Sequence, residues 1–214
     1  MADTGLTLWG VGTLRAMRAH WMLAEYGLDY ELRPIQSRTG ETYTEEYLAL
    51  NPRHKIPTLV HGAFVLVESA AIVNYIARTF PAPDGFFAPE DGARRAKLEE
   101  WCYFIMTELD AHCLYVIRRH GDLAHLYGGA PVAVEAAKSY FAEQIAAGVS
   151  RFDGAIDYLM PEGMSVADIL MVTTVDYALK CAIAIPAALL DYRARLIERP
   201  AYRRAQERNT PKAG

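Results

Sequence analysis

Through residues 1–80, short strand-like segments alternate with segments whose apolar side chains recur every three or four residues, as in a helix. Three apolar runs predict β-strands, at 6–9, 57–60 and 64–67, and we expect a further strand at 30–35. Apolar side chains at intervals of three and four residues predict helices, at 13–27, 45–50 and 69–79. The order is strand, helix, strand, then two strands and a helix. It predicts an α/β unit with a four-stranded sheet of mixed direction and helices on both faces.

The pattern changes near residue 80. Phe-Pro-Ala-Pro-Asp-Gly at 80–85 carries proline and glycine at the density of a linker, and the remainder of the chain shows only helical periodicity. Long helices are predicted at 98–116 and 132–159. We therefore expect a first domain at 1–80, a linker at 81–89 and an all-helical bundle domain at 90–214.

The helical half contains one recognisable helix start. Ser165 and Asp168 have the spacing of a capping box, in which each side chain bonds the other's main-chain N–H, so we interpret both as folding residues. Asp176 follows on the same apolar helix without an evident partner in the sequence.

Composition narrows the functional classes. The chain has 214 residues, of which 52% are hydrophobic, so it can bury a large core. A net charge of −4 argues against nucleic acid as a partner. No apolar run reaches the length of a membrane span, and residues 1–5 lack a signal-peptide pattern, so we expect a cytoplasmic protein without a membrane partner. Three cysteines and six histidines show no metal-ligand spacing, so no metal is predicted.

The most informative stretch is 51–57, Asn-Pro-Arg-His-Lys-Ile-Pro. Pro57 opens a strand to which it donates no hydrogen bond, and the Ile56–Pro57 bond could be cis. In that form the main-chain N–H and C=O of Ile56 would face solvent, where an extended peptide can add like an extra strand. The alternative is an ordinary proline at the start of a strand.

Glu68 and Ser69 stand where the fourth predicted strand gives way to a helix. A carboxylate beside a hydroxyl and the unpaired N–H groups of a helix start would suit the ammonium and carboxylate of an amino-acid head. The alternative interpretation of Ser69 is an ordinary N-cap.

Together, Asn-Pro-x-x-x-Ile-Pro and Glu-Ser-x-Ala-Ile resemble the glutathione-binding half of the cytosolic glutathione S-transferases, here of a bacterial, serine- or threonine-type kind. The resemblance extends over nearly the whole chain. It implies a thioredoxin-like first domain, a homodimer, and glutathione as co-substrate. The implied glutathione-binding residues are His54, Lys55, Ile56, Pro57, Glu68 and Ser69. His54 would contact the glycine carboxylate, whereas a solvated surface lysine is an equal alternative for Lys55.

The same resemblance suggests how the thiol would be activated. The catalytic serine of the serine-type enzymes falls on Thr13, whereas the tyrosine position falls on Trp9 and the cysteine position near Leu14 or Arg15. Thr13 would donate to the glutathione thiolate, and the N–H of Arg15 would add positive potential at the helix start. The alternative is that Thr13 is only an N-cap.

A second substrate would lie against the helical half. Aromatic and methionine side chains cluster at helical spacing after residue 100, a pattern that more often belongs to a core. We offer Tyr103, Met106 and Tyr115 as candidates for a pocket that takes a hydrophobic electrophile. Cleavage of ethers or disulfides, peroxide reduction and isomerisation remain alternatives at the same site. The isomerase type is disfavoured because Thr13-Leu14-Arg15 replaces its Ser-Ser-Cys. A non-catalytic glutathione-binding module is the remaining alternative.

Overall fold

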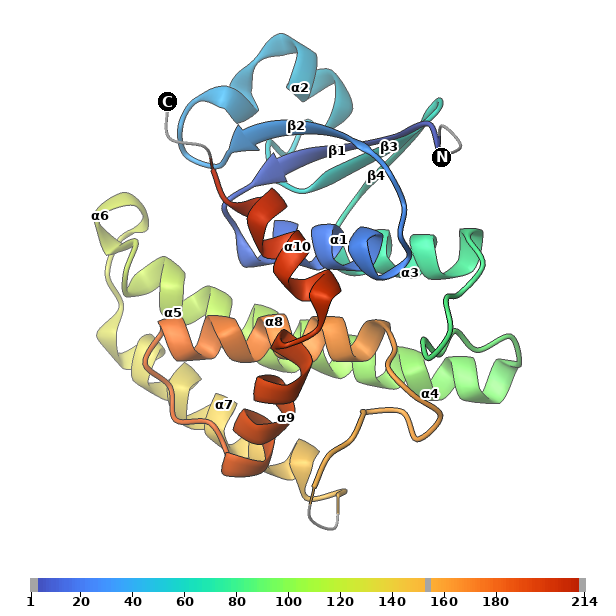
Figure 1. The fold of residues 1–214 in the computed structure, drawn as a ribbon. Helices are drawn as coiled ribbons and strands as arrows, with labels where there is room; N and C mark the ends of the chain where they lie inside the picture. Colours follow the sequence, from blue (N-terminus) through green and yellow to red (C-terminus); the bar gives the residue numbers. More distant parts are fainter. Residues whose placement is uncertain (1–3, 153–154, 212–214) are drawn as a thin grey trace. The chain divides into compact units, whose positions relative to one another are not determined.

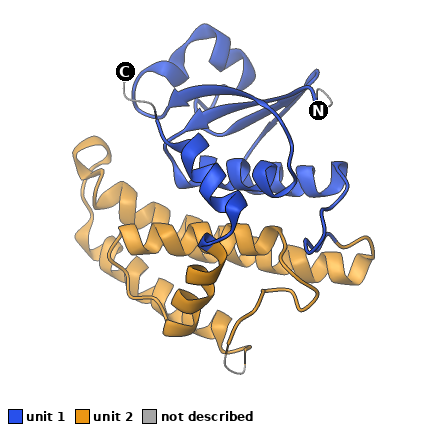
Figure 2. Cartoon of the chain, viewed as in Figure 1, with its two compact units in different colours: residues 1–88, 197–214 blue, residues 89–196 orange. Residues whose placement is uncertain are grey.

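The computed structural model describes residues 4–152 and 155–211. The chain forms two compact units, 1–88 together with 197–214, and 89–196 (Figure 2). The sequence analysis placed 197–214 with the helical half, because periodicity identifies a helix but not the element against which it packs. In the structure the last helix packs on the first unit, where the Tyr202 ring meets the edge of Trp21 at 4.9 Å.

A four-stranded sheet of mixed direction organises the first unit, as predicted. Its strand order is β2-β1-β3-β4, with β1 at Leu6–Val11, β2 at Glu31–Gln36, β3 at Thr58–His61 and β4 at Phe64–Val67. β1 pairs in parallel with β2 and antiparallel with β3, and β3 pairs antiparallel with β4. The thioredoxin-like arrangement expected from the sequence is therefore confirmed.

Helices cover both faces of this sheet (Figure 1). The helices of the first unit are α1 (Leu14–Glu25), α2 (Glu45–Leu50), α3 (Ser69–Thr79) and α10 (Pro200–Asn209), with a 3-10 turn, η1, at Glu41–Tyr43. α1 and α3 lie on one face, α2 lies on the other, and α10 runs beside α1. Residues 16–23 of α1 are all buried, which fits a helix with neighbours on more than one side.

The second unit is helical. Its first stretch runs through α4 (Gly92–Tyr103), a π-helical segment η2 (Phe104–Leu114) and α5 (Tyr115–His120). Its later helices are α6 (Ala124–Tyr127), α7 (Pro131–Val149), α8 (Val166–Lys180) and α9 (Ala187–Ile197), whose last residue falls in the first unit. In the described part of the chain, no helix is both long and apolar enough to cross a membrane.

The helix predicted over 132–159 ends at Val149, so its second end was predicted wrongly. The chain leaves the helix there, Phe152 stacks on Trp101 at 6.0 Å, and the Leu159 N–H donates to Asp168 Oδ1 at 2.9 Å. The bond from Leu159 places that residue beside the start of α8, which a helix continued to 159 would prevent.

The capping box at the start of α8 is confirmed. Asp168 accepts from the main-chain N–H of Ser165 at 2.7 Å and from Tyr192 Oη at 2.7 Å, and its carboxylate is fully buried. Burial raises the pKa of Asp168, while these hydrogen bonds oppose the rise. Asp176 does have a partner, Arg193, whose Nε donates to it at 2.5 Å, so the sequence analysis missed that pair.

Candidate functional site

The turn between β1 and α1 places Thr13 at the helix start. Thr13 has extended backbone angles, and its Oγ1 accepts from the main-chain N–H of Ala16 at 3.0 Å. It is therefore the N-cap of α1. Because the oxygen acts as acceptor in this bond, the hydroxyl proton is left for another partner. Arg15 lies half-buried in the first turn of the same helix.

Two side chains hold the loop before β3 by bonding to its main chain. Tyr47 Oη and Asn51 Nδ2 both donate to the Lys55 carbonyl, at 2.6 and 2.7 Å. Tyr47 Oη also lies 2.9 Å from Thr58 Oγ1. This buried network comes from α2 and β3, and it sets the path of the chain on both sides of Ile56.

The Ile56–Pro57 bond is cis, as the sequence suggested. Both side chains are buried, but Ile56 lies outside the sheet ladder because β3 begins at Thr58. Among the described residues, neither main-chain group of Ile56 has a hydrogen-bond partner. This edge can accept an added extended peptide.

The loop that carries Ile56 lies close to the end of β1, just before the turn that carries Thr13. Gly10, near the end of β1, has φ +114°, and a Cβ there would lie only 2.5 Å from Ile56 Cβ. Only glycine fits this position without moving Ile56. The sequence analysis did not identify Gly10. Its place two residues before Gly12, at the end of a predicted strand, is the signal that was available.

The buried ring of His20 bonds to the main chain of Gly10, at the end of β1. Its Nε2 lies 3.1 Å from the Gly10 carbonyl and its Nδ1 lies 2.7 Å from Tyr30 Oη. Burial is the main cause that lowers the pKa of His20 to about 4. The ring is thus neutral at neutral pH. Since a carbonyl can only accept, Nε2–H donates to Gly10 and Nδ1 accepts from Tyr30.

Glu68 and Ser69 lie at the start of α3, but Ser69 is not the N-cap residue. Glu68 is the N-cap residue, at φ 73° and ψ 115°, without a side-chain cap bond. Ser69 is the first helical residue and is 3% exposed, so reading it as the N-cap is wrong. A left-handed glutamate costs about 1–3 kcal/mol, which the surrounding contacts must offset.

Two arginines complete this part of the site. Arg53 Nη1 lies 2.9 Å from the exposed Glu68 carboxylate. Arg18, on α1, is 1% exposed, and its Nη1 donates to Ser69 Oγ at 3.2 Å. The sequence analysis left Arg18 without a role, because its partner lies 51 residues away. A buried guanidinium beside a helix N-terminus favours a bound anion.

His54 and Lys55 are exposed on the same loop as Arg53. His54 has φ 45°, and its ring stacks on Tyr43 with centroids 4.4 Å apart. His54 and Lys55 therefore face solvent beside Ile56, within one unit of the structure.

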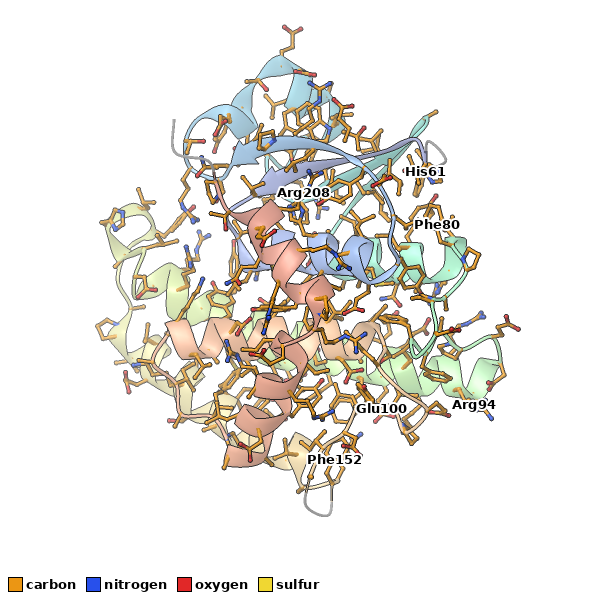
Figure 3. All side chains as sticks on the ribbon, viewed as in Figure 1. His61, Phe80, Arg94, Glu100, Phe152 and Arg208 are labelled. Atoms are coloured by element: carbon orange, nitrogen blue, oxygen red, sulfur yellow. The ribbon has the colours of Figure 1, made fainter. Side chains whose placement is uncertain are left out.

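The three pocket candidates lie on the helical unit, in the first long helical stretch. Tyr103 is 65% exposed, whereas Met106 and Tyr115 are half-buried. A cavity of about 210 Å³ in this unit involves none of them; it is lined by Glu100, Trp101, Phe104, Gln144, Ala147, Gly148 and Arg151. Glu100 and the neighbouring Phe152 are labelled in Figure 3.

Comparison with known proteins connects this geometry to a family. Residues 4–78 match the model "Glutathione S-transferase, N-terminal domain". Glutathione S-transferase D7 of Drosophila melanogaster is 32% identical over 174 residues, which cover 79% of this chain and 73% of that protein. Glutathione S-transferase theta-3 of Mus musculus is 30% identical over 158 residues, covering 69% of this chain but only 61% of that protein.

A solved structure agrees over a longer range. The theta-class glutathione S-transferase of the citrus canker pathogen Xanthomonas axonopodis pv. citri, with glutathione bound, is 27% identical. The similarity covers 95% of this chain and 97% of that one, with a TM-score of 0.76.

Proposed function

Because the chain belongs to the glutathione S-transferase family, we propose that it binds glutathione and activates the glutathione thiol for attack on a hydrophobic electrophile. The observation that carries this proposal is the contact between Gly10 and Ile56. It holds the end of β1, just before the Thr13 turn, against the loop whose main chain is open to an added peptide.

Each part of glutathione has a complementary group on the first unit. The main chain of Ile56 would pair with the cysteinyl residue, with Pro57 shaping the loop. Glu68 would accept from the γ-glutamyl ammonium. Ser69, supported by Arg18, would donate to the adjoining carboxylate. His54 and Lys55, which are exposed, would meet the glycine carboxylate.

Thr13 and the main chain of Arg15 would stabilise the thiolate. The cap bond from Ala16 uses the Thr13 oxygen as acceptor, so the hydroxyl proton can point to sulfur while the cap is kept. A hydrogen bond to a charged group supplies about 1.5–3 kcal/mol, which corresponds to a thiol pKa lowered by about one to two units from its usual 8.5 or so. The enzyme would then need no separate general base.

The remaining parts of the proposal concern the second substrate and the assembly. Tyr103, Met106 and Tyr115 are proposed to contact the electrophile from the helical unit, where Tyr103 is exposed. We also propose a cytoplasmic homodimer. Ether or disulfide cleavage, peroxide reduction and isomerisation would start from the same thiolate.

A glutathione-binding module without thiol activation is the competing candidate. It is favoured by the cap bond of Thr13, since a cap alone explains a threonine at this position. The two candidates differ in the pKa of bound glutathione.

The deciding experiment is a pH titration of thiolate absorbance with glutathione bound to the protein. Activation predicts a thiol pKa about one to two units below that of free glutathione. An unshifted thiol would refute activation and favour the binding module. A panel of aryl halides, ethers, peroxides and disulfides would then identify the reaction class.

A further inference from the structure

The last helix is fastened to α1 at its start and to Tyr30, just before β2, near its end. At its start, the Arg199 guanidinium makes two bonds to the Glu25 carboxylate, each of 2.7 Å. Near its end, Arg208 lies over the Tyr30 ring at 4.7 Å and donates to the Tyr30 carbonyl at 3.3 Å (Figure 3). These contacts fix the position at which Asn209, the last residue of α10, meets the turn between β1 and α1.

Asn209 bonds both sides of the β1–α1 turn. The Gly12 N–H donates to the Asn209 carbonyl at 2.8 Å and lies 3.1 Å from its Oδ1. Asn209 Nδ2 donates to the Thr13 carbonyl at 3.1 Å. Asn209 therefore bonds both the Gly12 N–H, just before Thr13, and the C=O of Thr13 itself. It lies 196 positions from Thr13 in the sequence.

The turn itself is closely covered. Gly12 has φ +80°, and a Cβ at that position would approach the Pro211 ring to 3.0 Å. The Thr13 carbonyl also accepts the first helical bond of α1, from Met17 N–H at 2.9 Å. Asn209 therefore bonds the same Thr13 carbonyl that begins the hydrogen bonding of α1. The position of this carbonyl sets the direction of α1 and of the Thr13 side chain.

Thiol activation depends on that direction. A hydroxyl donor must stay within about half an ångström of its productive position, and residues that hold it there contribute to rate without touching substrate. A free turn at a glycine of positive φ has more conformations than a clamped one.

We propose that Asn209 is a positioning residue for thiol activation, holding Gly12 and Thr13 so that the Thr13 hydroxyl meets the sulfur of glutathione. The inference rests on the proposed function and adds a residue from the opposite end of the chain. Asn209→Ala removes both side-chain contacts and keeps the main-chain bond to Gly12.

The test compares Asn209→Ala with Arg204→Ala in the full-length protein. Arg204 is a matched control because its side chain also links α10 to α1, donating to the Ala24 carbonyl at 3.2 Å, far from the turn. For Asn209→Ala we expect the pKa of the bound thiol to rise by about half a unit to one unit. kcat/KM should fall about three- to tenfold, mostly in kcat, with glutathione affinity within about twofold of the parent. Arg204→Ala should leave the pKa and kcat unchanged.

Amide hydrogen exchange at 12–15 reports the clamp independently of activity, and faster exchange is expected only in Asn209→Ala. A turn that exchanges faster while the thiol pKa stays at the parent value would overturn the inference and leave the proposed function standing. Equal changes in both variants would overturn it as well, since they would show a general effect of loosening α10. An unshifted thiol in the parent protein would instead refute the proposed function, and the inference with it.

Discussion

Replacing Thr13 by alanine separates its two roles, because they predict losses in different observables. The side chain caps α1 through one bond of 3.0 Å from Ala16. Removing an N-cap of this kind costs about 1 kcal/mol of stability, which in a chain of this length lowers the melting temperature by about 2–4 °C. That loss is expected whether or not the residue takes part in catalysis.

The catalytic role adds a second, larger effect. Without the hydroxyl, the thiolate keeps the N–H groups of the helix start but loses about 1.5–3 kcal/mol from one charge-assisted hydrogen bond. kcat/KM should then fall about ten- to a hundredfold, and the pKa of bound glutathione should rise by about one to two units. Thr13→Ser keeps both bonds and should retain most of the activity.

Thr44 offers a matched control in the same unit. It caps α2 as Thr13 caps α1, accepting from Tyr47 N–H at 3.3 Å. Thr44→Ala should therefore show a similar fall in melting temperature without the change in thiol pKa. Steady-state kinetics and thiolate titration of both variants are the assays. A Thr13→Ala enzyme that melts lower but turns over like the parent would refute the catalytic role and leave Thr13 as a cap alone.

Three further predictions test the rest of the first unit. Glu68→Ala and Ser69→Ala should each weaken glutathione binding by about 1–3 kcal/mol in calorimetry, and affinities within about twofold of the parent would contradict the proposed head-group site. Gly10→Ala should lower the free energy of unfolding by about 3 kcal/mol or more, because its Cβ would collide with Ile56 at a positive φ; a denaturant midpoint equal to that of the parent would contradict this. The pKa of His20 is about 4 in the folded chain against 6.5 for a free imidazole. Between these two pH values the unfolded chain binds a proton that the folded chain does not. The free energy of unfolding should therefore fall by about 3 kcal/mol as the pH drops from 6.5 to 4. Urea titrations across this range should show a slope that disappears in His20→Gln, and a slope shared by parent and variant would contradict the assignment.

The sheet and its order of elements could be predicted from sequence because β1, β3 and β4 are short apolar runs bounded by turn residues, and β2 follows the glycine that ends the first helix. The loop at 51–57 was predictable for a related reason, since a proline at a strand start limits the local backbone. The element against which a helix packs cannot be predicted in this way from the local sequence. The buried face of α10, with Ala201, Tyr202 and Ala205, says that something covers it, but not that α1 does. Its place in the first unit therefore appears only in the structure.

The residues missed in the site share a physical property: their roles depend on contacts made across long stretches of sequence. Arg18 looks like one polar position on an amphipathic helix until Ser69 is placed 3.2 Å from it. Asn209 looks like the end of a basic, solvated helix until its amide reaches Thr13. Local pattern carries no information on such pairs, whereas the motif residues could be named without them.

Backbone conformation explains why naming the motif does not amount to describing the site. His54 and Glu68 both have positive φ, at 45° and 73°, which local preference alone would disfavour by about 1–3 kcal/mol each. The contacts that can offset this cost are nearby: the ring of Tyr43 stacks on His54, and Arg53 pairs with the Glu68 carboxylate. Both contacts involve exposed groups, and an exposed ion pair contributes at most about 1 kcal/mol. The strain at Glu68 must therefore be supported mainly by what lies beneath it, the start of α3, where buried Ser69 is held by Arg18. Arg18 therefore belongs to the buried support of the first turn of α3, directly after the strained Glu68.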